Sequence, residues 1–268
     1  MFTFIYKNLK SLILSIALMF SLYSFSNSYE LESESINTNE KTAIVTGSNR
    51  GMGLGWVQHF LSEGYTVVAT ARKPDMATEL QNLKKKYKGK LFIQKLDVTS
   101  EEDQAELGEM LKKKNLKIDI AISNAGVTVQ EDFGNWTVKG FEINFKVNTI
   151  GVALFAQTIA PYLKNGATLV NLSSGAGSIT YQKKSSPLDA YRVSKAGVNM
   201  LTRNLSARLD DRQIIVVSIT PGGVKTDMNP NGKLSVAEAI PIMYESISKL
   251  TMENSGTFIN NKGKVMAW

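Results

Sequence analysis

The sequence contains no cysteine and only one histidine, and these two absences limit its chemistry. Without cysteine the chain forms no disulfide, carries no thiolate nucleophile and offers no sulfur ligand to zinc. His59 has no second histidine or cysteine with which to share a metal ion, so we expect no metal site. Internal repeats and low-complexity tracts are absent as well.

The composition is that of an ordinary globular protein. Of 268 residues, 43% are hydrophobic and 21% are charged, which fits one large α/β domain and excludes a fibrous or disordered chain. The net charge is +7, but the lysines cluster at 84–86 and 112–114, near the ends of expected helices. Cations there complement the helix dipole, so we expect solvated helix ends and no nucleic-acid partner.

The N-terminal residues have a different composition. A charged start, a short apolar run at 12–25 and small residues before position 29 are typical of a secretory signal peptide, although an anchor shares these features. We expect residues 1–28 to be signal-like or anchoring, residues 29–40 to be a polar linker, and residues 41–268 to form the domain. Export or membrane contact through the first segment would follow, whereas a mis-assigned start would leave the protein cytoplasmic.

From residue 42 onward, short apolar runs alternate with stretches of helix length. This alternation predicts a doubly wound Rossmann fold, in which a mostly parallel sheet is flanked by helices on both faces. Ligands of such sheets bind at the carboxyl ends of the strands. The strands are expected at 42–45, 66–69, 91–93, 118–122, 168–172 and 214–219, with a weaker seventh at 256–259.

Three glycines follow the first expected strand and open a helix. Because they lack Cβ, Gly47, Gly51 and Gly53 allow backbone N–H groups to approach a pyrophosphate at the helix N-terminus. Their spacing, Gly-x-x-x-Gly-x-Gly, is not the commoner Gly-x-Gly-x-x-Gly. A purely structural turn would also explain the glycines. Their position between the first strand and the first helix favours the phosphate-binding interpretation.

A second pattern joins a tyrosine to a lysine. Tyr191 and Lys195 lie four residues apart in an expected helix, so their side chains project to the same side. A free tyrosine has a pKa of about 10, which is too high for efficient proton exchange near neutrality. We expect the neighbouring ammonium to lower that pKa. Such pairs are common on surface helices, so the spacing alone is a weak signal.

Together these motifs resemble those of the short-chain dehydrogenase/reductase family over about residues 40–268. Beside the tyrosine and lysine, four ordered motifs carry the resemblance: Thr46 to Gly53, Asp97-Val98, Asn124-Ala125-Gly126, and Pro221-Gly222-Gly223-Val224-Lys225-Thr226. Ser123 stands where the family has an asparagine. Arg192 after the tyrosine, Lys225 to Met228 and the C-terminal segment 255–268 resemble the sniffer/C-factor-like carbonyl reductase branch.

The resemblance implies a set of catalytic residues. Ser174 matches the family's catalytic serine, with Ser173 as the alternative, and Asn148 matches its helix asparagine, with a purely structural amide as the alternative. Ser174 and Tyr191 would polarise a substrate carbonyl, and Tyr191 would donate the proton. Lys195 would also hold the nicotinamide ribose, and Asn148 would position a water. An insertion around residues 183–186 is expected to line the substrate pocket.

The resemblance also implies the cofactor contacts, with Asp97 contacting the adenine. The expected residues are Gly47, Asn49, Arg50, Gly51, Met52, Gly53, Arg72, Asp97, Val98, Asn124, Ala125, Gly126, Tyr191, Lys195, Pro221, Gly222, Val224 and Thr226.

The residues after the second strand indicate which nicotinamide cofactor binds. Sites that prefer NAD place an acid there to hold the ribose 2′-hydroxyl, but this chain has Ala71 followed by Arg72. With Arg50 in the glycine turn, two guanidiniums could bind a 2′-phosphate, which predicts NADP(H). Two solvated arginines are the simpler alternative.

These observations predict an NADPH-dependent oxidoreductase that transfers hydride between nicotinamide and a small carbonyl or alcohol substrate. The resemblance also implies a homodimer or homotetramer. The alternative is an NADP(H)-binding sensor or signalling protein of the same fold with little turnover.

Overall fold

The computed structural model describes residues 40–182 and 185–268. Outside the described residues lie the expected leader, residues 29–39 of the expected linker, and Lys183 and Lys184 of the expected pocket insertion. These stay predictions. Residues Lys41–Trp268 form one compact unit. Within the described part of the chain, no helix is both long and apolar enough to cross a membrane.

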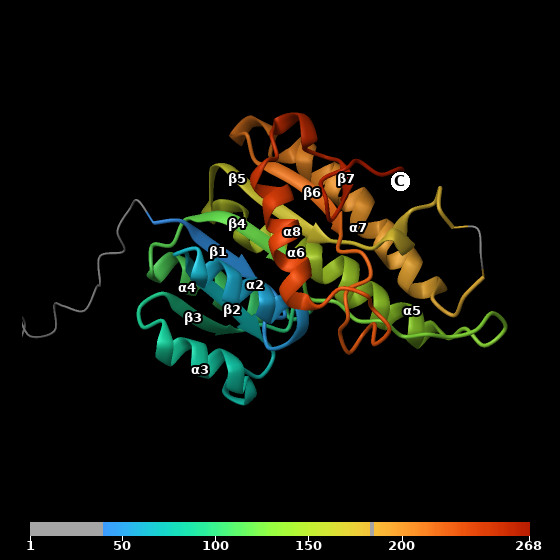
Figure 1. Cartoon of the computed structure of the whole chain (residues 1–268), viewed down its shortest axis with the longest axis horizontal. Coiled ribbons are helices and arrows are strands. Elements are labelled where there is room, and N and C mark those ends of the chain that lie inside the picture. The colour runs from blue at the N-terminus through green and yellow to red at the C-terminus, as the bar shows by residue number, and fades with distance from the viewer. Residues whose placement is uncertain (1–39, 183–184) are drawn as a thin grey trace, which may run out of the picture. The chain divides into compact units, whose positions relative to one another are not determined.

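The unit is built on one sheet of seven parallel strands in the order β3-β2-β1-β4-β5-β6-β7 (Figure 1). The expected doubly wound parallel sheet is therefore confirmed. The strands are β1 Thr42–Val45, β2 Thr66–Ala71, β3 Leu91–Lys95, β4 Ile118–Ser123, β5 Leu163–Leu172, β6 Ile215–Thr220 and β7 Phe258–Asn260.

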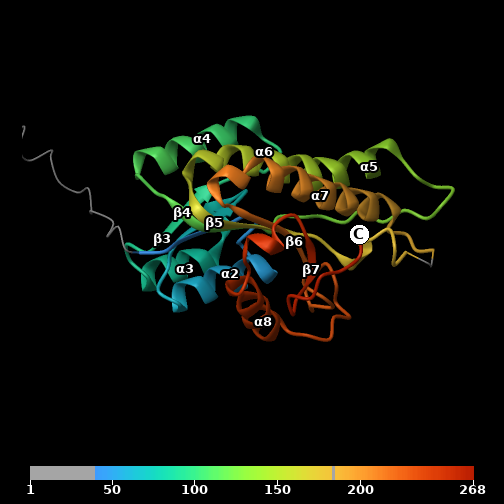
Figure 2. The same ribbon diagram turned by 90° about the horizontal axis from the view of Figure 1, so that it is seen from above.

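Helices cover both faces of this sheet. Figure 2 shows α4, α5, α6 and α7 on one face and α2, α3 and α8 on the other. The α-helices are α2 Gly51–Ser62, α3 Thr78–Lys86, α4 Glu101–Lys113, α5 Val138–Phe145, α6 Gly151–Ile159, α7 Asp189–Arg208 and α8 Val236–Ser248. A π-helical turn, Lys146–Ile150, joins α5 to α6, and short 3₁₀ turns lie at 74–76, 160–162, 175–177, 210–212 and 252–254.

The two helical layers explain why three inner strands are buried along their whole length. Every residue of β1, β2 and β6 is buried, because a strand covered on both faces has no solvent side. The strand β3 lies at the sheet edge, and most of its residues are only partly buried. The continuous apolar runs in the sequence therefore mark the strands nearest the middle of the sheet.

One strand differs by more than two residues from the expected bounds. β5 begins at Leu163, five residues before the expected start at 168. The added stretch contains Gly166 at φ +79°, and the pairing with β4 shifts register between Ile118 and Ile120. A bulge of this kind lets the polar residues Lys164 and Asn165 join a strand without an apolar pattern.

The strand order reverses between β1 and β4. The chain passes from β1 to β2 and β3 on one side, then crosses back so that β4 pairs with the other edge of β1. A crevice opens at the carboxyl ends of strands where the order reverses in this way, and ligands bind there. The loops after β1 and β4 are therefore the first place to look for a site.

The helical layer over β4 and β5 gives a stability prediction. Phe155 on α6 is fully buried, so Phe155→Ala should lower the free energy of unfolding by about 3–5 kcal/mol through the cavity it leaves. Phe133 is 79% exposed, and Phe133→Ala should change the free energy of unfolding by less than about 0.5 kcal/mol. Urea denaturation with an unchanged m-value measures both, and equal losses would contradict the packing described.

Candidate active site

The glycine turn after β1 is folded tightly against the segment after β4. Gly47 has φ +66°, and a Cβ there would lie 3.0 Å from Ala125 Cα. A Cβ on Gly53 would lie 2.1 Å from the Gly47 carbonyl oxygen, so only glycine allows α2 to start this close to the turn. The expected need for glycine at these two positions is explained by backbone contact.

Hydrogen bonds close the same crevice from both sides. Thr46 Oγ1 accepts from the backbone N–H groups of Asn124 and Ala125, each at 3.0 Å. The Asn124 amide donates to the carbonyl oxygens of Thr46 at 2.8 Å and Gly47 at 3.2 Å. Both hydrogens of the Asn124 side-chain amide are used in these bonds. The side chain therefore holds the glycine turn in place and is not available to donate to a ligand.

A cavity of about 260 Å³ lies at this crevice. Thirteen of the expected cofactor contacts line it: Gly47, Asn49, Arg50, Gly51, Met52, Gly53, Arg72, Asp97, Val98, Asn124, Ala125, Gly126 and Thr226. The structure places Tyr191, Lys195, Pro221, Gly222 and Val224 outside this lining. It adds residues that the contact set left out, namely Leu96, Thr99, Val127, Val147, Asp227 and Met228. All six follow directly on, or lie next to, a motif read from the sequence.

The cavity has the features that an anionic dinucleotide requires. Gly51 has φ +55°, and a Cβ built on it meets only Thr226 Cγ2, at 3.9 Å, so the turn is open on that side. α2 starts at Gly51 without a side-chain cap from Arg50, and its first residues line the cavity. Uncapped N–H groups at a helix N-terminus favour phosphate. The residues present therefore fit the expected cofactor.

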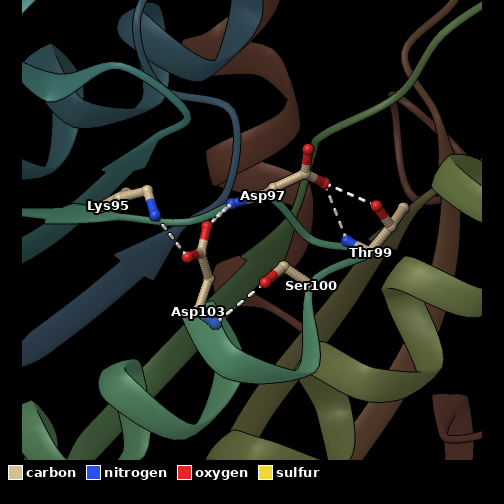
Figure 3. Close-up of polar contacts among 5 residues, drawn as sticks. All are labelled: Lys95, Asp97, Thr99, Ser100 and Asp103. Atoms are coloured by element: carbon tan, nitrogen blue, oxygen red, sulfur yellow. Dashed lines mark hydrogen bonds and ion pairs between the residues drawn. The ribbon is translucent and has the colours of Figure 1, made fainter.

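The loop after β3 forms the opposite end of the cavity. Asp97 Oδ1 accepts from both Thr99 N, at 3.0 Å, and Thr99 Oγ1, at 2.8 Å. Figure 3 shows the other oxygen of Asp97 pointing away from these contacts. Asp97, Val98 and Thr99 all line the cavity, in agreement with the expected position of an adenine-binding segment.

Two arginines lie at the cavity where a charged group of the ligand could be held. Arg72 follows β2 directly and is exposed, while the preceding Ala71 is buried. Arg50 forms an ion pair with Asp227 at 3.2 Å, and both side chains are largely exposed. The last residue of β2 is Ala71 and not an acid, so no carboxylate at that position repels a phosphate.

Tyr191 lies near the start of α7, and Ser174 is the neighbouring side chain that affects its pKa. Burial raises the pKa of Tyr191, and an interaction with the Ser174 hydroxyl opposes that rise. The expected lowering by Lys195 is therefore not what this structure shows. The lysine ammonium lies 5.8 Å from the centre of the tyrosine ring and donates instead to the Leu172 carbonyl oxygen, at 2.7 Å.

Lys195 itself is buried, and burial lowers its pKa from 10.5 to about 8. A link to the cavity runs through Gly126. A Cβ built on this glycine would lie 3.2 Å from Asn148 Oδ1 and 3.7 Å from Lys195 Nζ. Gly126 is also one of the residues that line the cavity. Lys195 and Asn148 therefore lie close behind the part of the lining that Gly126 forms.

The two serines after β5 have different surroundings. Ser173 is buried, and its hydroxyl donates to Asn199 Oδ1 at 2.7 Å. Ser174 caps the turn at 175–177, accepting from Ala176 N at 3.2 Å, and it is the serine that contacts Tyr191. The geometry therefore brings Ser174, and not Ser173, to the tyrosine.

Asn148 lies in the π-helical turn and is fully buried. Its amide donates to the Val127 carbonyl oxygen at 2.9 Å and to Ser194 Oγ at 3.0 Å, and its Oδ1 accepts from Val127 N at 2.8 Å. Both amide hydrogens are thus used to join α7 to the segment after β4. Sequence gave no sign of the π turn, which is a feature often found at functional sites.

Comparisons with known proteins agree with this geometry. A family model described as short chain dehydrogenase matches residues 41–235. The short chain dehydrogenase gsfK of Penicillium aethiopicum is 32% identical over 251 residues, which cover 85% of this chain and 99% of that protein.

Solved structures are similar over the whole described unit. The NADPH-bound carbonyl reductase from chicken fatty liver is 37% identical with a TM-score of 0.79, covering 85% of this chain and 99% of that one. Carbonyl reductase Sniffer of D. melanogaster is 28% identical with a TM-score of 0.81, covering 86% and 100%. The chain therefore belongs to the short-chain dehydrogenase/reductase family, and its relatives of known structure include carbonyl reductases of the Sniffer type.

Proposed function

We propose that this protein is an NADPH-dependent reductase of small carbonyl compounds, with the corresponding alcohols as products. The observation that carries the proposal is the grouping of Tyr191, Ser174 and Lys195. The Ser174 hydroxyl opposes the rise in the pKa of the phenol, and the Lys195 ammonium lies 5.8 Å from the centre of the tyrosine ring. Asn148 and Lys195 lie close to Gly126, which lines the cavity. Carbonyl reductases among the solved relatives support the same substrate class.

The choice of NADP(H) rests on charge at the end of β2. Arg72 and Arg50 can bind a 2′-phosphate with paired N–H groups, and Ala71 leaves no carboxylate to oppose it. The Asp227 carboxylate that pairs with Arg50 is exposed, so the arginine can change partners at little cost. A relative from chicken is described with NADPH bound and another, from Burkholderia multivorans, with NADP bound.

When bound, the cofactor supplies the hydride, and the residues of the chain manage the substrate oxygen and its proton. Ser174 and Tyr191 donate hydrogen bonds to the carbonyl oxygen, and Tyr191 transfers its proton to the oxygen as negative charge develops there. The raised pKa keeps Tyr191 protonated at neutral pH. A protonated tyrosine serves reduction, since oxidation of an alcohol would require the phenolate.

Lys195 and Asn148 act around this pair. The Lys195 ammonium is held at the carboxyl end of β5 by the Leu172 carbonyl, where its charge favours the phenolate left after proton transfer. Asn148 fixes Val127, at the cavity wall, and Ser194, on α7, with its two amide hydrogens. The side chain of Asn148 thus ties the cofactor side of the site to the helix that carries Tyr191.

Removing the phenolic hydroxyl tests the proton donor. Tyr191→Phe should lower kcat/KM for NADPH-dependent carbonyl reduction by about 10²–10⁴-fold, because general acid catalysis is lost. The dissociation constant for NADPH should stay within about twofold, as the hydroxyl serves the proton transfer. Stopped-flow fluorescence and steady-state assays measure the two quantities. Tyr87→Phe, at the end of α3, is the control, and turnover retained by Tyr191→Phe would refute the role.

Removing the arginines tests the cofactor choice. The double variant Arg50→Ala/Arg72→Ala should raise KM for NADPH by at least about tenfold while leaving KM for NADH nearly unchanged, because only NADPH carries the 2′-phosphate. Arg72→Lys should keep part of the preference, since an ammonium retains charge without the paired geometry. Equal efficiency of the unmodified enzyme with both cofactors would sink the NADP(H) proposal.

The buried Lys195 is expected to lower the stability of the fold while serving the proposed reaction. With a pKa near 8 in the folded protein and 10.5 in the free side chain, charged Lys195 destabilises the fold by about 3 kcal/mol at pH 7. Lys195→Met removes this penalty but also loses the bond to Leu172, worth about 1 kcal/mol, so it should gain about 2 kcal/mol.

The direction in which this stability difference changes with pH follows from the lowered pKa of Lys195. The penalty is fully present below pH 8 and fades toward pH 10.5, so the advantage of the methionine variant should fall below about 1 kcal/mol at pH 9.5. Denaturant unfolding at pH 7 and 9.5 measures the difference, together with the loss of carbonyl reduction. A variant less stable than the unmodified protein at pH 7, or a gain independent of pH, would contradict a charged buried lysine.

A further inference from the structure

A buried carboxylate lies behind the loop after β3, which lines the cavity. Asp103 is the third residue of α4 and is 3% exposed. One of its oxygens accepts from Asp97 N at 2.7 Å, and the other accepts from Lys95 Nζ at 2.8 Å (Figure 3). Its own N–H is capped by Ser100 Oγ at 3.1 Å.

The direction of the Asp103 side chain is unusual for its position. A carboxylate at the third residue of a helix commonly accepts from the N–H of the capping residue. Here the N–H of Ser100 donates to the Asp97 carbonyl oxygen at 2.9 Å, and the Asp103 carboxylate reaches three residues further back. The bond therefore serves the loop that carries Asp97 more than the end of α4.

The carboxylate is ionised despite its burial. Burial alone would raise the pKa of Asp103, but the Asp97 N–H and the Lys95 ammonium outweigh it and lower that pKa. Lys95 is itself 56% exposed along its side chain, so its charge stays hydrated while it meets the buried oxygen. A charged acceptor holds a backbone N–H more strongly than a neutral one does.

The loop held in this way forms a wall of the cavity. Asp97, Val98 and Thr99 line it, whereas Asp103 does not. The neighbouring Gln104 adds a second bond from α4, since its amide donates to the Val98 carbonyl oxygen at 3.1 Å. Two consecutive buried side chains of one helix thus fix the backbone of Asp97 and Val98.

We propose that Asp103 is a positioning residue for the adenosine end of the cofactor, acting through the backbone of Asp97. The inference rests on the proposed NADP(H) function, because the loop is assigned to the adenine of that cofactor. Asp103 touches no ligand. Its carboxylate orients the main chain at Asp97, so that the Asp97 and Val98 surface is ready before the cofactor arrives, and the ordering cost of binding is reduced.

A second carboxylate provides a matched control. Asp119 accepts from a backbone N–H, that of Thr42, at 2.7 Å, and from Lys164 Nζ at 2.9 and 3.0 Å. It makes the same kinds of contact as Asp103, although its side chain is more exposed, and it is the second residue of β4, near the amino end of that strand. Asp119→Asn should break the same kinds of contact without touching the cofactor loop.

The experiment measures binding of adenosine 2′,5′-bisphosphate, which carries the adenine and the 2′-phosphate but no nicotinamide. Asp103→Asn should weaken its binding about tenfold by calorimetry and raise KM for NADPH about as much, since an amide opposes either Lys95 or the Asp97 N–H with its NH₂ group. At saturating NADPH, kcat should stay within about twofold. Asp119→Asn should leave both constants unchanged.

A double variant separates positioning from general loss of stability. Lys95→Met/Asp103→Asn removes the ammonium, so the amide oxygen can turn to the Asp97 N–H and should recover most of the binding. If Asp103→Asn does not fold, hydrogen exchange at the Asp97 amide of the unmodified protein replaces it. That amide should already be protected without ligand.

Each outcome decides the proposal. Unchanged bisphosphate binding in Asp103→Asn, an equal loss in Asp119→Asn, no recovery in the double variant, or an unprotected Asp97 amide would each overturn it. Failure of the unmodified protein to bind the bisphosphate would instead count against NADP(H) as cofactor, and protection of the Asp97 amide would still decide whether Asp103 orders the loop.

Discussion

The close contact between the glycine turn and the segment after β4 is the constraint on which the rest of the site depends. Gly47 and Gly53 allow the turn to approach within van der Waals distance of Ala125, and Thr46 and Asn124 lock the approach with four hydrogen bonds. Because these groups are satisfied by one another, the remaining backbone of both loops is left to line the cavity. A larger residue at either glycine would separate the two loops that form the crevice.

A second requirement is the burial of charge. Burial of the Lys195 ammonium lowers its pKa to about 8. Asp103 is also buried, but two hydrogen-bond donors lower its pKa and keep it ionised. The two groups lie behind different parts of the cavity lining and serve different ends of the same ligand in the proposed function. Functional sites commonly retain such perturbed groups although apolar residues would stabilise the fold more.

The sequence was sufficient for the parts of the site that depend on local pattern. The glycine turn, the Tyr191 and Lys195 spacing and the loops after the strands all lie where they were expected, because each is set by a strand end or a helical turn. The choice of Ser174 over Ser173 needed the partner of each hydroxyl, since Asn199 lies 26 residues from Ser173. Asp103 gave no signal, because an acid in the first turn of a helix is ordinary.

The pKa of Tyr191 shows why proximity in sequence does not decide electrostatics. Residues four apart on a helix face the same side, yet the Lys195 ammonium turns to the carbonyl of Leu172 while the phenol turns to Ser174. Burial then dominates and raises the pKa of Tyr191. Any stabilisation of the phenolate by Lys195 would lower that same pKa, and in this structure burial is the larger effect. Tyr191 therefore holds its proton until negative charge develops on the substrate oxygen, which is what a general acid in carbonyl reduction requires.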